Sequence, residues 1–198
     1  MNNILKIALI LLFINCKAQT TVDISTFNQG DNSNKYFKDL NNNSLYFVGT
    51  WENTTSTWEE TNSTITFRVI IWKDEKRPLL NEVNSYMDKL FGKFMIIKNL
   101  GLPNEVILHN SVKYFPQSNT TTEWSLLGTP YNSTVFGAYF EDTCANGGNG
   151  ILTGTSKMEI TNPGINPSIA HWTVKKTIPL KPGESFTVPT DIMLTKVN

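Results

Sequence analysis

The chain has 198 residues and no net charge, because 17 Lys and Arg residues balance 17 Asp and Glu residues. A chain without a basic stripe is a poor partner for nucleic acid, and this length suits one domain with its own buried core. Only two cysteines occur, Cys16 and Cys144, so no disulfide framework is expected.

The first fifteen residues have the pattern of a signal peptide. The amino terminus and Lys6 carry positive charge, and residues 7–14 read "IALILLFI", eight apolar residues in succession. A helix of that length spans about 12 Å, whereas the hydrocarbon core of a bilayer is roughly 30 Å thick. We therefore interpret residues 1–15 as a secretory leader and expect the protein to be exported.

Cys16 follows directly after the apolar run, and two processing routes fit the sequence. In the favoured one, "FINC" is a loose lipobox and Cys16 becomes the lipidated first residue of the mature chain. The usual lipobox has Leu and a small residue where this chain has Phe13 and Asn15. In the alternative, an ordinary signal peptidase cuts after Ala18. The favoured route predicts a bacterial membrane lipoprotein whose anchor partner is the membrane, at the periplasmic face or the cell surface.

A polar stretch, "NQGDNSNK" and "NNNS", follows the leader. We expect residues 16–44 to form the lipidated N-terminus and a tether, since a flexible coil of 28 residues spans about 30 Å. Within it, "YFKDL" (residues 36–40) is read as a short helical turn. The folded domain is then expected over residues 45–198.

Alternation of apolar and polar residues dominates that domain. "TITFRVIIW", "GILTGTSKMEI" and "IAHWTVKK" each show the two-residue period of a half-buried strand. Turn-rich separators such as "KNLGLPN", "CANGGNG" and "NPGINP" divide about eight such segments. The pattern predicts an all-β fold of about eight strands, an antiparallel barrel or a sandwich, and we favour the barrel. The inward-facing residues expected from the three segments include Ile65, Phe67, Val69, Ile71, Leu152, Met158, Ile160, Ala170, Trp172 and Val174.

One segment is ambiguous. "PLLNEVNSYMDKL" places Leu79, Leu80, Val83 and Met87 at helical spacing after Pro78, a residue common in the first turn of a helix. We expect a short helix over residues 79–87 as an option, followed by a strand from about residue 88.

The stretch "YFVGTWEN" resembles the opening strand of lipocalins, where a G-x-W pattern precedes a Trp that plugs one end of the barrel. Gly49 and Trp51 carry the pattern here. The resemblance implies that Trp51, a side chain able to bury on the order of 200 Å², seals the barrel end. Lipocalins also pack an Arg of the last strand on this Trp, and the last segment here offers only Lys196.

Most of the chain also resembles a family of small uncharacterised lipoproteins from flavobacteria and their relatives. The residues that carry the resemblance are the leader ending "CKAQ", then "KDLNN", "FVGTWE", "HWTV" and the final "VPTDIMLTK". The resemblance implies lipidation of Cys16. No activity or catalytic residue is assigned to that family, so none is carried over.

No catalytic or metal-binding motif stands out. His109 and His171 lack metal-ligand spacing, and each is read as a residue on the polar face of a strand. "EDTCANGGNG", which contains Cys144, is interpreted as a hairpin connection and not a calcium loop, since it lacks the ligand pattern of an EF-hand. We therefore expect a binding protein without cofactor or metal, not an enzyme.

Two binding functions are compatible with these patterns. The first is a small apolar ligand held inside the barrel; the alternative is a surface interaction or carbohydrate-binding module that uses exposed aromatic residues. A cavity of roughly 300 Å³ or more would favour the interior site, and a solid core with an aromatic patch would favour the surface. The interior candidates are Trp51, Ile65, Phe67, Val69 and Trp172. The surface candidates are Trp58 and Trp72.

Overall fold

The computed structural model describes residues 19–28, 30–56, 63–115, 120–122, 124–148, 150–176 and 178–197. The expected leader, Cys16 and Trp58 lie outside these residues. The chain divides into two compact units, which are described separately. Unit 1 comprises Met1–Leu40 and Glu75–Asp88, and unit 2 comprises Asn41–Asp74 and Lys89–Asn198.

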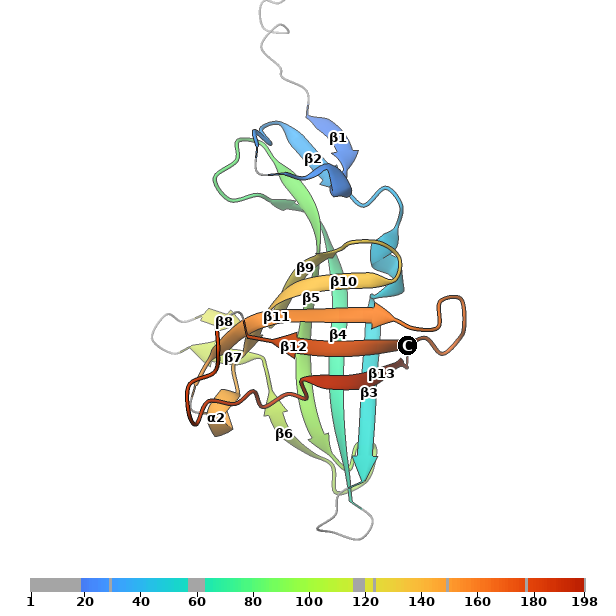
Figure 1. The fold of residues 1–198 in the computed structure, drawn as a ribbon, viewed down its shortest axis with the longest axis vertical. Coiled ribbons are helices and arrows are strands. Elements are labelled where there is room, and N and C mark those ends of the chain that lie inside the picture. The colour runs from blue at the N-terminus through green and yellow to red at the C-terminus, as the bar shows by residue number, and fades with distance from the viewer. Residues whose placement is uncertain are drawn as a thin grey trace, which may run out of the picture. The chain divides into compact units, whose positions relative to one another are not determined.

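A closed antiparallel barrel of eight strands dominates the fold, as predicted (Figure 1). The order runs from β5 through β4, β3, β13, β12, β11 and β10 to β9. Pairing of Phe91 in β5 with Leu127 in β9 closes the ring. The barrel strands are β3 (Gly49–Ser56), β4 (Thr64–Pro78), β5 (Tyr86–Lys98), β9 (Leu126–Pro130), β10 (Val135–Asp142), β11 (Leu152–Ile160), β12 (Ile169–Lys175) and β13 (Asp191–Lys196).

The remaining elements are short. They comprise β1 (Thr20–Asp23), η1 (Ile24–Thr26), β2 (Lys35–Lys38), η2 (Asn43–Tyr46), β6 (Val106–Asn110), β7 (Lys113–Phe115), β8 (Thr120–Thr122) and α2 (Ala145–Gly148). Strand β6 pairs with β5, and β7 forms a hairpin with β8. Over the described part of the chain, no helix combines the length and the apolar character needed to cross a bilayer.

The predicted alternation sets which side chains fill the barrel. In β11, buried and exposed residues alternate from Leu152 to Lys157 without a break, and β12 buries Ala170, Trp172 and Val174. Each strand therefore contributes every second side chain to one interior. Among the described residues, Ala170, Trp172 and Val174 belong to a core cluster of 20 buried residues, which also includes Met158 and Ile160 of β11. The inward faces expected for β11 and β12 are thus confirmed, and in β4 Phe67, Val69 and Ile71 are buried while Ile65 is half-buried.

The barrel contains Trp51 as a completely buried residue, as the plug interpretation requires. Its indole Nε1 donates a hydrogen bond to the Phe47 carbonyl oxygen at 2.8 Å. Lys196 Nζ lies 5.5 Å from the centre of the Trp51 ring and donates to the Tyr46 carbonyl oxygen at 3.0 Å. Lys196 of the last strand thus takes the place of the Arg that lipocalins pack on this Trp. An ammonium group can do so because cation–π attraction requires a positive charge over the ring and not a guanidinium in particular.

The optional helix over residues 79–87 is wrong. Residues 79–85 form a turn between β4 and β5, and Tyr86 and Met87 already belong to β5, paired in parallel with β2. Two asparagines in the turn, Asn81 and Asn84, adopt positive φ angles of 65° and 50°. A single left-handed residue interrupts a right-handed helix, and asparagine tolerates that conformation well, so two of them favour a turn.

Unit 1 contains structure where the sequence suggested a flexible tether. Strand β1 pairs in parallel with β2, and Tyr36, expected in a helical turn, lies in β2. A small core holds the unit together, in which Ile24, Phe37 and Met87 are buried. The few apolar residues of this polar segment were not recognised as a core in the sequence, because the side chains that they pack against come from residues 79–87.

Candidate functional site

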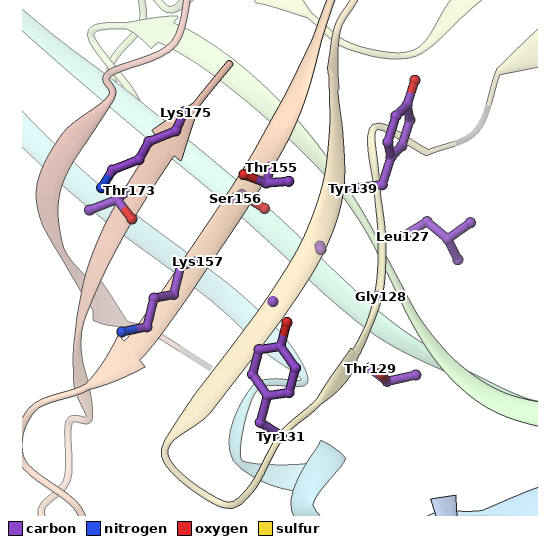
Figure 2. Close-up of a pocket in the computed structure, with 12 residues that line it drawn as sticks. Leu127, Gly128, Thr129, Tyr131, Tyr139, Thr155, Ser156, Lys157, Thr173 and Lys175 are labelled. Atoms are coloured by element: carbon purple, nitrogen blue, oxygen red, sulfur yellow. The ribbon is translucent and has the colours of Figure 1, made fainter. Parts of the chain in front are cut away.

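A groove lies on the outer face of the barrel, across β9, β10, β11 and β12, with a volume of about 540 Å³ (Figure 2). Strand register places its residues in two rows. The first row runs Leu127, Tyr139, Thr155, Lys175. The second row runs Thr129, Gly137, Lys157, Thr173. Each strand contributes the residues that alternate with its buried ones, so the barrel interior and the groove share the same strands.

Two tyrosines form one side of the groove, and Figure 2 shows them opposite two lysines. Tyr131 is 71% exposed and Tyr139 is 44% exposed. The Tyr131 ring lies over Gly137: a Cβ added to this glycine would be only 2.7 Å from Tyr131 Cε2. Because Gly137 has no side chain, the Tyr131 ring can occupy the space above it. The ring rests on the backbone there, while most of the Tyr131 side chain stays exposed to solvent.

Hydroxyl and amine groups cover the rest of the groove. Thr155 and Lys157 come from β11, and Thr173 and Lys175 come from β12, on the same face (Figure 2). Lys157 Nζ lies 2.6 Å from the Glu159 carboxylate, so its position is set by an ion pair. The groove thus combines apolar ring faces with hydrogen-bond donors and acceptors and with positive charge.

Tyr139 is held in its neutral form. Partial burial raises its pKa, and the negative charge of Glu141 and a hydrogen bond to that carboxylate raise it further. The phenol hydroxyl of Tyr139 donates a hydrogen bond to Glu141 Oε2, with an oxygen–oxygen distance of 3.4 Å. Since an ordinary tyrosine loses its proton only near pH 10, Tyr139 keeps its proton well beyond neutral pH and retains a hydrogen-bond donor.

The interior residues expected to hold an apolar ligand lie together in the core of the barrel. Trp51, Val69 and Trp172 have no exposed surface, and Phe67 is 3% exposed. The rings of Phe67 and Trp172 are 5.9 Å apart, and Ile65 packs on the same cluster. The structure therefore brings these five residues into one core, where the rings of Phe67 and Trp172 pack against each other.

The surface candidate Trp72 belongs to a second aromatic cluster. Its ring stacks on Phe91 at 6.2 Å, and Phe91 contacts Trp124 edge-on at 5.8 Å. Trp72 is half-buried and lines a smaller depression of about 350 Å³ with Ile70, Lys93 and Val112. Much of its ring is therefore used to cover Phe91, which leaves less free aromatic surface than the two tyrosines offer.

Two other titratable side chains, His171 and Asp142, have structural partners. His171 Nε2 lies 2.7 Å from Asp191 Oδ1 on the exposed face of β12 and β13. Asp142 is fully buried and accepts hydrogen bonds from the backbone amides of Cys144 and Thr187. Among the described residues, no group of three or more His, Cys, Asp or Glu side chains is arranged to hold a metal ion.

Sequence reasoning missed the groove. "STVFGAYFED" shows that Tyr139 alternates with buried residues, and Tyr131 stands beside a turn, so their exposure could be read locally. Their closeness to Lys157 and Lys175 could not, because it depends on which strands pair and in which register.

Comparison with known proteins adds no relative to this description. No protein-family model matches the chain, and searches of curated proteins and of solved structures also give no match. The site must therefore be interpreted from its own chemistry.

Proposed function

We propose that this protein is an exported, membrane-tethered lipoprotein whose barrel binds a carbohydrate, without catalysis, in the outer groove. The observation that carries the proposal is the pairing of two exposed tyrosines with threonine hydroxyls and lysine amines in one hollow of about 540 Å³. The solid packing of Phe67 and Trp172 favours this surface over an interior site. The anchor part of the proposal comes from the leader and Cys16.

Sugars suit this combination of groups. A pyranose has an apolar face of C–H groups that can lie on an aromatic ring, and a rim of hydroxyls that needs hydrogen-bond partners. Tyr131 offers the ring, and Thr155 and Thr173 offer hydroxyls on neighbouring strands. Lys175 adds a positive charge at the end of the first row, so we expect an acidic saccharide to bind more tightly than a neutral one.

The binding test uses calorimetry with two purified probes, an oligogalacturonate and a neutral cello-oligosaccharide. We expect the acidic probe to bind, and Tyr131→Ala or Tyr139→Ala to weaken binding about tenfold, the loss expected when one stacking ring worth about 1.4 kcal/mol is removed. Lys175→Met should remove the preference for the acidic probe while leaving the neutral one unaffected.

A matched control is Tyr46→Ala, because Tyr46 is 49% exposed and does not line the groove. If Tyr46→Ala weakens binding as much as Tyr131→Ala, the groove is not the site. Unchanged binding by both Tyr131→Ala and Tyr139→Ala would also show that the groove is not the site.

The interior ligand stays a prediction with its own measurement. Native mass spectrometry of protein purified from membranes would report a carried small molecule together with the mass of the mature N-terminus. A bound apolar molecule released only on unfolding would place the ligand among Phe67, Val69 and Trp172 and would contradict the preference for the groove.

A further inference from the structure

The turn between β4 and β5 in unit 1 exposes two large apolar side chains. Leu80 is 90% exposed and Val83 is 72% exposed. Their neighbours Leu79 and Met87 pack in the small core of unit 1 instead. One exposed apolar side chain is common on a protein surface. Two of them at the tip of one turn form a small exposed apolar patch.

Backbone hydrogen bonds hold this tip in place. Leu79 N donates to the Ser85 carbonyl oxygen at 2.9 Å, which closes the turn. Ser85 Oγ donates to the Asn32 carbonyl oxygen at 2.6 Å, and Asn34 N donates to the Val83 carbonyl oxygen at 3.0 Å. Because the turn is tied at its base and along one side, Leu80 and Val83 stay directed away from the core of unit 1.

The chain enters unit 1 beside the same tip. Gln19 Nε2 donates to the Asn84 carbonyl oxygen at 3.0 Å, and Asn84 directly follows Val83. Cys16 is three residues before Gln19. Three extended residues span at most about 11 Å, so a lipid on Cys16 is tied close to the tip and not at the end of a long tether.

We propose that Leu80 and Val83 insert into the surface of the bilayer to which Cys16 is anchored, which fixes unit 1 against the membrane. This inference rests on the lipid anchor of the proposed function. Acyl chains are the apolar partner that the position of Cys16 brings within reach. One lipid chain gives only marginal membrane binding, and a second apolar contact strengthens it.

Charge around the tip supports insertion without attraction to anionic lipids. Glu82 lies between the two apolar residues in the sequence and is half-buried. A carboxylate there would be repelled by an acidic membrane surface, so we expect that anionic lipid will not strengthen binding to vesicles and that added salt will not weaken it.

The test places an environment-sensitive fluorophore at the tip. The variant Leu80→Cys, in a Cys144→Ala background, is labelled with NBD on the lipidated protein and on a mature chain that carries no lipid because of the further substitution Cys16→Ser. The control is Ile178→Cys, since Ile178 is 70% exposed and belongs to unit 2. On vesicles of phosphatidylethanolamine and phosphatidylglycerol, we expect a blue shift of the emission at position 80 and none at position 178.

A second variant, Leu80→Ser with Val83→Ser, should weaken vesicle binding of the chain without lipid about tenfold or more, given the apolar surface removed. If intact mass shows the lipid on Cys16 but the probe at position 80 stays in water, the insertion proposal fails while the anchor stands. If no lipid is present, the anchor fails, and the probe on vesicles alone then decides about insertion. A blue shift that grows with protein concentration without vesicles would indicate a second copy as the partner and would overturn the proposal.

Discussion

The two faces of strands β10, β11 and β12 differ completely, although they are built from adjacent residues. On the inner face, Phe140 and Trp172 contact each other edge-on at 5.9 Å with no exposed surface. On the outer face, Tyr139 and Lys157 border an open groove. The inner aromatic side chains stabilise the core, whereas the outer ones have exposed surface that a partner can contact. Aromatic content by itself therefore says little about binding until the face is known.

The largest effect expected is that of Trp172→Ala. Removing a fully buried indole leaves a cavity among Phe67, Phe140 and the rest of the core, so the free energy of unfolding should fall by about 3–5 kcal/mol. Chemical denaturation measures the change. The matched outer-face variant Tyr139→Ala should alter stability by no more than about 0.5 kcal/mol. A small effect for Trp172→Ala would mean that the interior is loosely filled and able to accept a ligand.

Two glycines sharpen the same contrast. A Cβ at Gly128 would collide with the Gly137 carbonyl oxygen, so Gly128→Ala forces backbone to move and should cost about 1–3 kcal/mol. The three atoms nearest to a Cβ at Gly137 all belong to the Tyr131 side chain, the first at 2.7 Å, and that side chain can swing aside. Gly137→Ala should therefore leave thermal unfolding almost unchanged while it weakens saccharide binding. Equal destabilisation by both variants would contradict this assignment of faces.

A smaller loss is expected for Lys196→Met, which keeps the volume of the side chain but removes its charge. The Tyr46 and Leu45 carbonyl oxygens then lose their donor, and the Trp51 ring loses its cation. We expect a loss of about 1 kcal/mol in urea unfolding. Lys196→Arg is the control, because it restores a cation over the ring. No rescue by arginine would show that the ammonium geometry, and not the charge, is required.

The smallest effect concerns the outer ion pair. A hydrogen bond from Lys157, and then its charge, lower the pKa of Glu159. The stabilisation from this lowered pKa is present above the ordinary Glu value near 4.3 and is lost as the pH falls through the lower folded value. Lys157→Met should return the Glu159 pKa toward its ordinary value in an NMR titration, with no resolvable change in unfolding. An unchanged pKa would mean that the pair does not form in solution.

The sequence allowed the fold class to be predicted because period-two alternation survives in nearly every strand. It also located Trp51 and Trp172 in the core. It failed for residues 79–87, where the spacing of Leu79, Val83 and Met87 fits a helix as well as a turn. Only the pairing of Met87 with Phe37 of β2 decides between them, and that contact spans about fifty residues of chain.

The sequence by itself determined which side chains of each strand lie on the same face, because alternation is a local property of an extended backbone. The tertiary structure decided which strands are neighbours. Pairing of β9 with both β5 and β10 closes the barrel and brings Tyr131 and Tyr139 opposite Lys157 and Lys175. Such pairings join residues that are distant in sequence, so their register depends on the whole set of strands closing together and cannot be read from any one segment.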